Sequence, residues 1–489
     1  MKPYPPIPSF YHLIFLSLSF WNCNRPVPPP EVHGAGAVEK MWPQEWMYAQ
    51  RAYPYPSINR EAVRDAWRQA KEATTTGRTA AQWEPAGPVN VGGRITALVL
   101  HPADQNIIYV GTSAGGIFKT TNKGATWTAV FEEAGAMSVG ALAMAPSDPE
   151  VLYMGAGEAN GSATSGAFFG DGVYKTTDGG NTWTHIGLAN TQHIGRIAID
   201  PVNADRVYVA AAGVLYGKND ERGLYRTTDG GTNWEQVLFV SDSTACIDVV
   251  VNPVNASIVY AATWERIRYP WQRHYGGPTS RVYRSFDGGN SWEQLTNGLP
   301  PDSDQTGRIG LAIAPSNPAV LYACYTTDPV TNTFDGIYKS EDAGSSWTRV
   351  DQSDISFVFS SFGWFFGNLR VHPTESNDVS LLGVLLVRST DGGATWADAT
   401  FNMHVDFHAL EFHPQNPFFV VAGNDGGVYI SEDGGFNWQH AQGLPNNLIY
   451  NCEIDHLQPN HLYAGFQDQG TQRTLTGAVD DFERILGAD

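Results

Sequence analysis

The chain has 489 residues, among them 51 glycines, 30 prolines and 15 tryptophans, and only 16% of its residues are charged. High glycine and low charge exclude a coiled coil, while the 42% hydrophobic and 12% aromatic shares exclude global disorder. The formal net charge of −20 repels phosphate backbones, so no nucleic-acid partner is expected.

The first segment, residues 1–23, resembles an export signal. An apolar run from Leu13 to Trp21 follows Lys2 and is too short to span a bilayer as a mature helix. Cys23 ends this run, and a proline-rich stretch follows it, as in bacterial lipoproteins. We therefore expect a protein that is extracellular or attached to the cell envelope, with a lipid anchor on Cys23 as one means of attachment.

The next two segments lead into the main domain. Residues 24–56 are rich in proline and predict a linker. Residues 57–80 predict a helix, because small and apolar residues recur there at helical spacing around Trp67. The three remaining cysteines, Cys246, Cys324 and Cys452, lie in apolar runs and predict small buried side chains.

Residues 82–489 form a repeat. Seven segments match the pattern Ser/Thr-x-Asp/Asn-x-Gly-x-x-Trp, and they end at Trp127, Trp183, Trp234, Trp292, Trp347, Trp396 and Trp438. A second pattern, an apolar run with a Pro/Asn turn, precedes each of them and occurs an eighth time at 456–466. Each unit reads as four short antiparallel strands, which is a propeller blade. We predict an all-β propeller with seven complete four-stranded blades, a partial eighth and a C-terminal truncation.

This repeat resembles the bacterial neuraminidase repeat, or Asp box, of sialidases, sortilin-type receptors and xyloglucanase-type glycoside hydrolases. The resemblance implies that the Asp-box turns are structural and lie on the face away from the ligand. It favours an exported glycan-active propeller that binds polysaccharide or glycoprotein and could hydrolyse it. The alternative is a non-catalytic, sortilin-like receptor or scaffold that binds protein segments, because one fold serves both functions.

The loops on the ligand face carry the candidate catalytic carboxylates. The xyloglucanases use two aspartates, and blade count matches their loops to residues 112–116 and 466–472. Asp468 in the second loop could be the acid. The first loop carries Ser113 instead of an aspartate, which leaves the two-carboxylate mechanism open. Asp425 and Asp406 are the other candidate catalytic residues.

A candidate metal site lies in the sequence His-Val-Asp-Phe-His. In an extended strand, His404, Asp406 and His408 would point to one side and could hold a divalent metal or act as an acid and base. They could equally form a hydrogen-bonded strand end. We expect these three residues to converge with Asp425 and Asp468. The repulsion among the carboxylates then requires a cation, protonation of a histidine or a raised carboxyl pKa.

Aromatic and basic side chains are the candidate ligand-binding groups. The loops 263–281 and 357–368 are rich in aromatic residues that suit stacking on sugars, or that pack on neighbouring blades. Arginines in Gly-Arg-Ile motifs before inner strands could bind a carboxylate or support the fold, although no sialidase-type motif surrounds them. The candidates are Trp264, Trp271, Tyr275, Trp364, Arg94, Arg196 and Arg308. Glu158 and Asp171 could add carboxylates to the same face.

Overall fold

The computed structural model describes residues 43–55, 58–75, 84–132, 135–160, 168–268, 273–327, 334–351 and 355–487. The chain divides into two units, residues 1–60 and 61–489. Helix α1 (Pro43–Ala52) lies within the segment expected to be a linker, and α2 (Arg60–Thr75) lies where a helix was expected. None of the described helices is long and apolar enough to cross a membrane. The predicted export signal and Cys23 lie outside the described residues.

Residues 61–489 are built mainly from eight four-stranded antiparallel sheets. The first four sheets are β1 (Ile95–Leu100), β2 (Ile108–Thr112), β3 (Ile117–Thr120) and β4 (Thr128–Ala129); β5 (Val139–Ala145), β6 (Asp148–Ala156), β7 (Val173–Thr176) and β8 (Thr184–Gly187); β9 (Ile194–Asp200), β10 (Asn203–Ala211), β11 (Gly223–Thr227) and β12 (Glu235–Leu238); and β13 (Thr244–Val251), β14 (Val259–Glu265), β17 (Val282–Ser285) and β18 (Glu293–Leu295). A two-stranded sheet, β15 (Ile267–Arg268) and β16 (Arg273–His274), is inserted in the fourth.

The other four sheets follow the same order. They are β19 (Thr306–Ile313), β20 (Leu321–Thr327), β21 (Phe334–Ser340) and β22 (Thr348–Arg349); β23 (Asn368–Val371), β24 (Val379–Leu382), β25 (Leu386–Ser389) and β26 (Ala397–Asp398); β27 (Phe407–His413), β28 (Asn416–Asn424), β29 (Gly427–Ser431) and β30 (Gln439–Ala441); and β31 (Ile449–Ile454), β32 (Leu462–Phe466), β33 (Gly470–Thr474) and β34 (Glu483–Leu486). A short 3-10 helix, η1 (Ser356–Val358), precedes β23.

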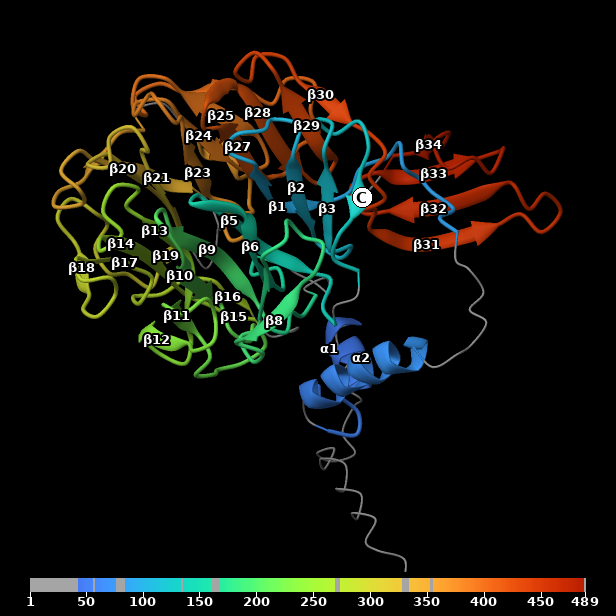
Figure 1. Ribbon diagram of the computed structural model, residues 1–489, viewed down its shortest axis with the longest axis horizontal. Coiled ribbons are helices and arrows are strands. Elements are labelled where there is room, and N and C mark those ends of the chain that lie inside the picture. The colour runs from blue at the N-terminus through green and yellow to red at the C-terminus, as the bar shows by residue number, and fades with distance from the viewer. Residues whose placement is uncertain are drawn as a thin grey trace, which may run out of the picture. The chain divides into compact units, whose positions relative to one another are not determined.

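The first seven sheets form a closed ring (Figure 1). The first strand of each contacts the first strand of the next, and β1 contacts both β5 and β27. These seven inner strands surround a channel with a cavity of about 620 Å³. The prediction of an all-β propeller is confirmed.

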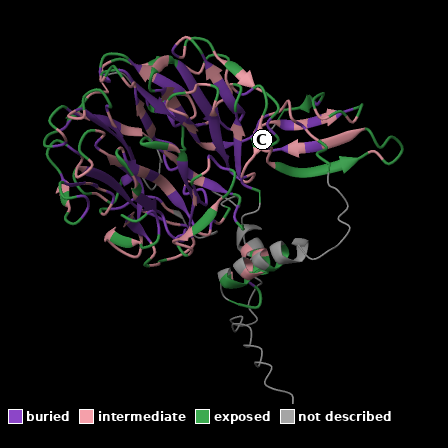
Figure 2. Ribbon diagram, viewed as in Figure 1, coloured by how far each residue is buried: buried purple, intermediate pink, exposed green. Residues whose placement is uncertain are grey.

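The eighth sheet, β31–β34, lies outside this ring (Figure 1). The prediction that the eighth unit is incomplete is wrong, because β34 supplies a fourth strand. The turn before it is closed without an Asp box, by Thr474 and Thr476 donating hydrogen bonds to Asp481. Strand β31 is exposed along its length, unlike the inner strands of the ring (Figure 2), so Cys452 is exposed rather than buried as expected.

The repeated turns show why their sequence recurs. In the second sheet, Asp178 Oδ1 accepts hydrogen bonds from the backbone N–H of Thr182, at 2.9 Å, and from Thr176 Oγ1, at 2.7 Å. Hydrogen bonds from Thr182 and Thr176 lower the pKa of Asp178 to about 2. Of the seven repeat tryptophans, Trp347 is buried and the other six are half-buried, each packed against the core of a sheet. These residues hold the fold together.

Candidate functional site

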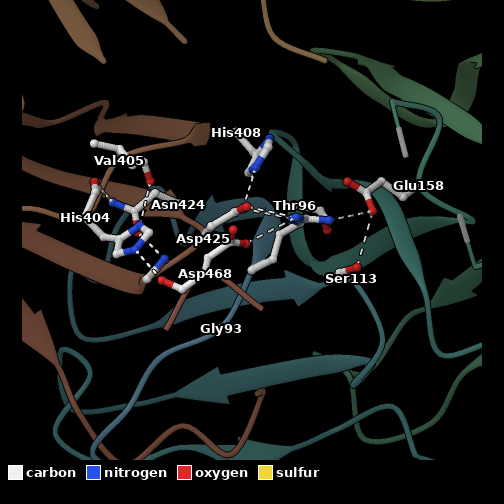
Figure 3. Close-up of polar contacts among 12 residues, drawn as sticks. Gly93, Thr96, Ser113, Glu158, His404, Val405, His408, Asn424, Asp425 and Asp468 are labelled. Atoms are coloured by element: carbon white, nitrogen blue, oxygen red, sulfur yellow. Dashed lines mark hydrogen bonds and ion pairs between the residues drawn. The ribbon is translucent and has the colours of Figure 1, made fainter. Parts of the chain in front are cut away.

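Antiparallel strand order brings a set of charged residues to one face of the ring. The start of the first strand and the end of the second strand of each sheet lie at the same edge. Arg94 precedes β1, Glu158 follows β6 and Asp425 follows β28, while Asp468 follows β32 of the eighth sheet. Figure 3 shows the three carboxylates together with Ser113, which follows β2. The repeated turns that end at the seven tryptophans join third and fourth strands and therefore lie at the opposite edge.

Arg94 and Asp425 form the centre of this cluster. The Nε and Nη2 atoms of Arg94 each donate a hydrogen bond of 2.8 Å to Asp425, and both side chains are 3% exposed. The Nε2 atom of His408 lies 2.7 Å from Asp425 Oδ1. Burial alone would raise the pKa of Asp425, but Arg94 and His408 hold it well below its usual range. Asp425 is therefore an ionised, fully engaged carboxylate.

Arg94 also reaches two further carboxylates. Its Nη1 atom lies 3.7 Å from Glu158 Oε2, and its Nη2 atom lies 3.6 Å from Asp468 Oδ2. Although burial alone would lower the pKa of Arg94, the negative charges of Asp425, Glu158 and Asp468 raise it. One guanidinium group thus joins acidic residues from three sheets.

Two phenylalanines support this arrangement. Arg94 lies over the ring of Phe365, 5.1 Å from its centroid, and Phe366 stacks on His408 at 5.4 Å. Both phenylalanines lie in the segment 357–368, where Trp364 was the expected ligand-binding residue. The adjacent pair Phe365 and Phe366 is the feature of the sequence that could have indicated this role, because neighbouring aromatic rings can contact a cation and an imidazole ring.

Asp406 is the carboxyl group of this cluster whose pKa is raised. Its carboxylate oxygens lie near those of Asp425 and Asp468, with one atom of each within 4.8 Å of the others. Burial, followed by the charge of Asp425, raises the pKa of Asp406 to about 6. Asp406 and Asp468 also have positive φ angles, 69° and 64°. Backbone strain in non-glycine residues tends to gather at functional sites.

The expected alternation of His404, Asp406 and His408 along a strand is wrong. Strand β27 begins only at Phe407, and the positive φ of Asp406 turns the chain before it. The structure nevertheless brings together the five residues that were expected to converge. His404 reaches Asp468, because its Nε2 lies 3.2 Å from that residue's backbone oxygen.

The proposed metal ligands do not fit a metal centre well. Both ring nitrogens of His404 lie 3.0 and 3.2 Å from backbone oxygens, and His408 Nε2 faces Asp425. The carboxylate repulsion that suggested a divalent metal is offset instead by Arg94 and by the raised pKa of Asp406. The oxygens of Asp406, Asp425 and Asp468, within 4.8 Å of one another, are the atoms in this cluster that could bind a cation together.

Three of the aromatic candidates are buried, which favours packing on neighbouring blades over stacking on sugars. Trp264 has no exposed surface, and its Nε1 donates a 2.6 Å hydrogen bond to the backbone oxygen of Tyr275. Tyr275 stacks on Trp364 at 5.3 Å, and their exposed fractions are 2% and 5%. Trp264 lies in strand β14, and Tyr275 and Trp364 lie in loops, but all three belong to one hydrophobic core cluster. Trp271 lies outside the described residues.

We expect Trp264→Phe to lower the free energy of unfolding by about 1–3 kcal/mol, because it leaves a cavity and an unsatisfied carbonyl on Tyr275. Chemical denaturation would measure this loss. A variant that keeps its stability but loses affinity for glycan would contradict the buried assignment and restore the ligand-binding one.

Two of the three candidate arginines lie together, because Arg196 and Arg308 both donate to Asn368 Oδ1, at 3.4 and 2.9 Å. Arg94 has other partners. Arg196 pairs with buried Asp248 at 3.0 Å, while Arg308 donates to Asn160 at 3.2 Å and to Asn368 at 2.9 Å. Burial lowers the pKa of Arg308 to about 10. Arg196 and Arg308 thus brace the channel between sheets, and of the three only Arg94 joins the carboxylate cluster. Asp171 is also apart from it, since it accepts a 2.7 Å hydrogen bond from Tyr174.

Comparison with known proteins links this fold to two groups. The family model Sortilin-Vps10, described as sortilin, neurotensin receptor 3, matches residues 222–363. A xyloglucanase of Hypocrea jecorina is 25% identical over 435 residues, which cover 80% of this chain and 47% of the relative. A probable oligoxyloglucan-reducing end-specific xyloglucanase of Neosartorya fischeri is 24% identical over 425 residues, covering 70% and 50%. The chain spans about half the length of these relatives.

Solved structures give the same result for the fold. The GH74 xyloglucanase from Xanthomonas campestris has a TM-score of 0.58 at 17% identity, with 83% of this chain and 70% of that chain covered. An ancestral GH74 enzyme has a TM-score of 0.60 at 20% identity, covering 82% and 55%. The chain is therefore a β-propeller that resembles the xyloglucanases and the sortilin propeller.

Proposed function

We propose that this protein is an exported glycoside hydrolase that binds xyloglucan-type polysaccharide at the Arg94 cluster and cleaves it by acid–base chemistry. In this proposal the ring is a seven-bladed propeller, and the eighth sheet supplies Asp468 from outside it. The xyloglucanase relatives support the substrate class. Residues 1–23, which resemble an export signal, support action outside the cytoplasm. Attachment by a lipid anchor at Cys23 is part of the proposal.

The observation that carries this function is the contrast between neighbouring carboxyl groups. Asp425 is held ionised by Arg94 and His408, while burial raises the pKa of Asp406 to about 6. In an active site that uses one carboxyl group as an acid and another as a carboxylate, the surroundings keep the pKa of the first high and that of the second low. We assign Asp406 as the proton donor to the leaving oxygen. Asp468 lies close to Asp406, and its side chain is more exposed than that of Asp425. We assign Asp468 the role of orienting the sugar.

A pH profile tests this assignment directly. Because Asp406 must be protonated to act as an acid, kcat/KM for xyloglucan should fall about tenfold per pH unit above pH 6. Reducing-end release at pH 4–9 would measure the profile. A flat profile up to pH 8 would contradict Asp406 as the acid.

The sortilin-like receptor is the alternative outcome. Tight binding of xyloglucan or of a peptide, without release of any reducing ends at any pH, would support a non-catalytic propeller and refute the hydrolase.

A further inference from the structure

The middle of the channel carries charged residues that the acid–base chemistry proposed above does not use. Arg196 on β9, Arg370 on β23 and Glu411 on β27 line the cavity of about 620 Å³. Asp248 on β13 and Arg308 on β19 are buried beside it, 0% and 2% exposed. These five residues carry three guanidinium groups against two carboxylates, so one positive charge is left among them.

Ion pairs account for two of the three guanidinium groups. Arg196 Nε donates a hydrogen bond to Asp248 Oδ1 at 3.0 Å, and Arg370 Nε donates one to Glu411 Oε1 at 2.8 Å. Arg308 donates to two asparagine side chains instead, and its Nη1 atom has no hydrogen-bond partner among the described residues. The charge of Arg308 is therefore the one that no ion pair within this group of five balances.

Arg196 and Arg370 each keep one terminal nitrogen for a ligand in the cavity. Nη2 of Arg196 donates to Asn368 Oδ1 at 3.4 Å, and Nη1 of Arg370 donates to the backbone oxygen of Leu369 at 2.9 Å. The other terminal nitrogens, Nη1 of Arg196 and Nη2 of Arg370, donate no hydrogen bond to any residue that the structure describes. The two side chains are 21% and 18% exposed, and because both line the cavity, they are exposed toward the channel.

These two arginines meet across the channel. They lie on β9 and β23, both inner strands of the ring (Figure 1). Asn368 and Arg370 are two residues apart on β23, so their side chains point to the same side, and Arg196 reaches Asn368 from β9. Burial lowers the pKa of Arg370, and the charge of Arg196 lowers it further. An anion between the two guanidinium groups would relieve this repulsion and accept a charge-assisted hydrogen bond from each.

We propose that the middle of the channel binds one small monovalent anion between Nη1 of Arg196 and Nη2 of Arg370. A single negative charge balances the guanidinium charge that the carboxylates leave, and an uncompensated charge inside a protein is costly. Chloride and a short carboxylate such as acetate share this chemistry, since each is a monovalent acceptor of N–H hydrogen bonds.

This site is distinct from the Arg94 cluster. Glu158, the other acidic residue on the cavity wall, lies 3.7 Å from Arg94 Nη1 and belongs to the channel mouth. The anion site uses no residue to which a step of the hydrolysis is assigned, so it can be tested without measuring turnover.

Thermal unfolding of the full chain at constant ionic strength tests this site. Sodium chloride or sodium acetate replaces sodium morpholinoethanesulfonate, whose anion is too bulky for a position between two side chains. We expect the Tm to rise by about 2–3 °C and then level off, because a ligand of the folded state alone stabilises it until the site is filled. The two titrations show which of the two anions the site prefers.

Two variants with opposite expected effects assign this rise to the channel. Arg370→Gln should abolish it, because one of the two donors and the remaining positive charge are lost. Glu411→Gln should lower the Kd of the anion at least about tenfold, since the channel then holds two uncompensated positive charges. Arg473→Gln is the matched control and should leave the rise unchanged, because Arg473 and its partner Glu483 are 36% and 59% exposed. Should Arg370→Gln fail to fold, Glu411→Gln decides.

Bromide locates the anion directly. In a crystal soaked in sodium bromide, an anomalous-scattering peak should lie in the channel, in contact with both Arg196 and Arg370. A Tm that does not rise, that rises without levelling off, or that rises equally in Arg370→Gln overturns the site. So does an unchanged Kd in Glu411→Gln, or a bromide peak that is found only outside the channel.

Discussion

Replacing Arg94 with leucine should lower the free energy of unfolding by about 3–5 kcal/mol, the typical cost of removing one partner of a buried ion pair. Arg94 donates two 2.8 Å hydrogen bonds to Asp425, and both side chains are 3% exposed. Without the guanidinium group, Asp425 must stay charged in the interior or take up a proton. Urea denaturation at pH 7 would measure the loss.

Two companion variants show whether the loss comes from the stranded carboxylate. Asp425→Asn in the Arg94→Leu background should recover about 1–3 kcal/mol, because the uncompensated charge is gone. Arg370→Leu removes a guanidinium whose partner, Glu411, keeps 34% of its side-chain surface exposed, so it should cost less. A loss below about 1 kcal/mol for Arg94→Leu would mean that water already solvates this cluster.

The architecture could be predicted from the sequence because its signal is repeated. Each of the seven repeated turns has the same hydrogen bond from a backbone N–H to an Asp or Asn side chain, so these residues recur at the same place in the first seven sheets. The fourth strand of the eighth sheet was missed because its turn uses Thr474 and Asp481 instead. Helix α1 lay in a segment whose prolines suggested a linker.

The site was predictable only in part. The convergence of His404, Asp406, His408, Asp425 and Asp468 follows from their places at strand ends, which the repeat defines. The burial of Tyr275 and Trp364 depends on how inserted loops pack, and insertions have no counterpart in other repeats. Arg94, Arg196 and Arg308 share the same Gly-Arg-Ile motif, which could not show that Arg94 alone contacts Asp425 and Asp468. Those partners come from sheets far away in the sequence.

Replacing Asp406 with asparagine should change stability and catalysis in opposite directions. A carboxyl group whose native pKa is raised binds its proton more tightly in the folded state, so its contribution to stability is lost as pH rises from about 4 to above 6. Asparagine carries no charge and tolerates the positive φ of 69° at this position. We therefore expect Asp406→Asn to raise the free energy of unfolding by about 1–3 kcal/mol at pH 8 and hardly at all at pH 4.

The same substitution should lower kcat on xyloglucan by about 100- to 10,000-fold, because asparagine cannot protonate the leaving oxygen. Denaturation at pH 4 and pH 8, beside reducing-end release at pH 5, would measure both effects, with Asp304→Asn on the exposed surface as the control. Greater stability with full activity would place the raised pKa outside the reaction and leave Asp406 a strained structural residue. Lower stability at pH 8 would show instead that the ionised carboxylate is held favourably, which would remove the reason to regard Asp406 as an acid. Only the combination of gained stability and lost turnover identifies a carboxyl group that the fold keeps protonated, at a cost in stability, for use in catalysis.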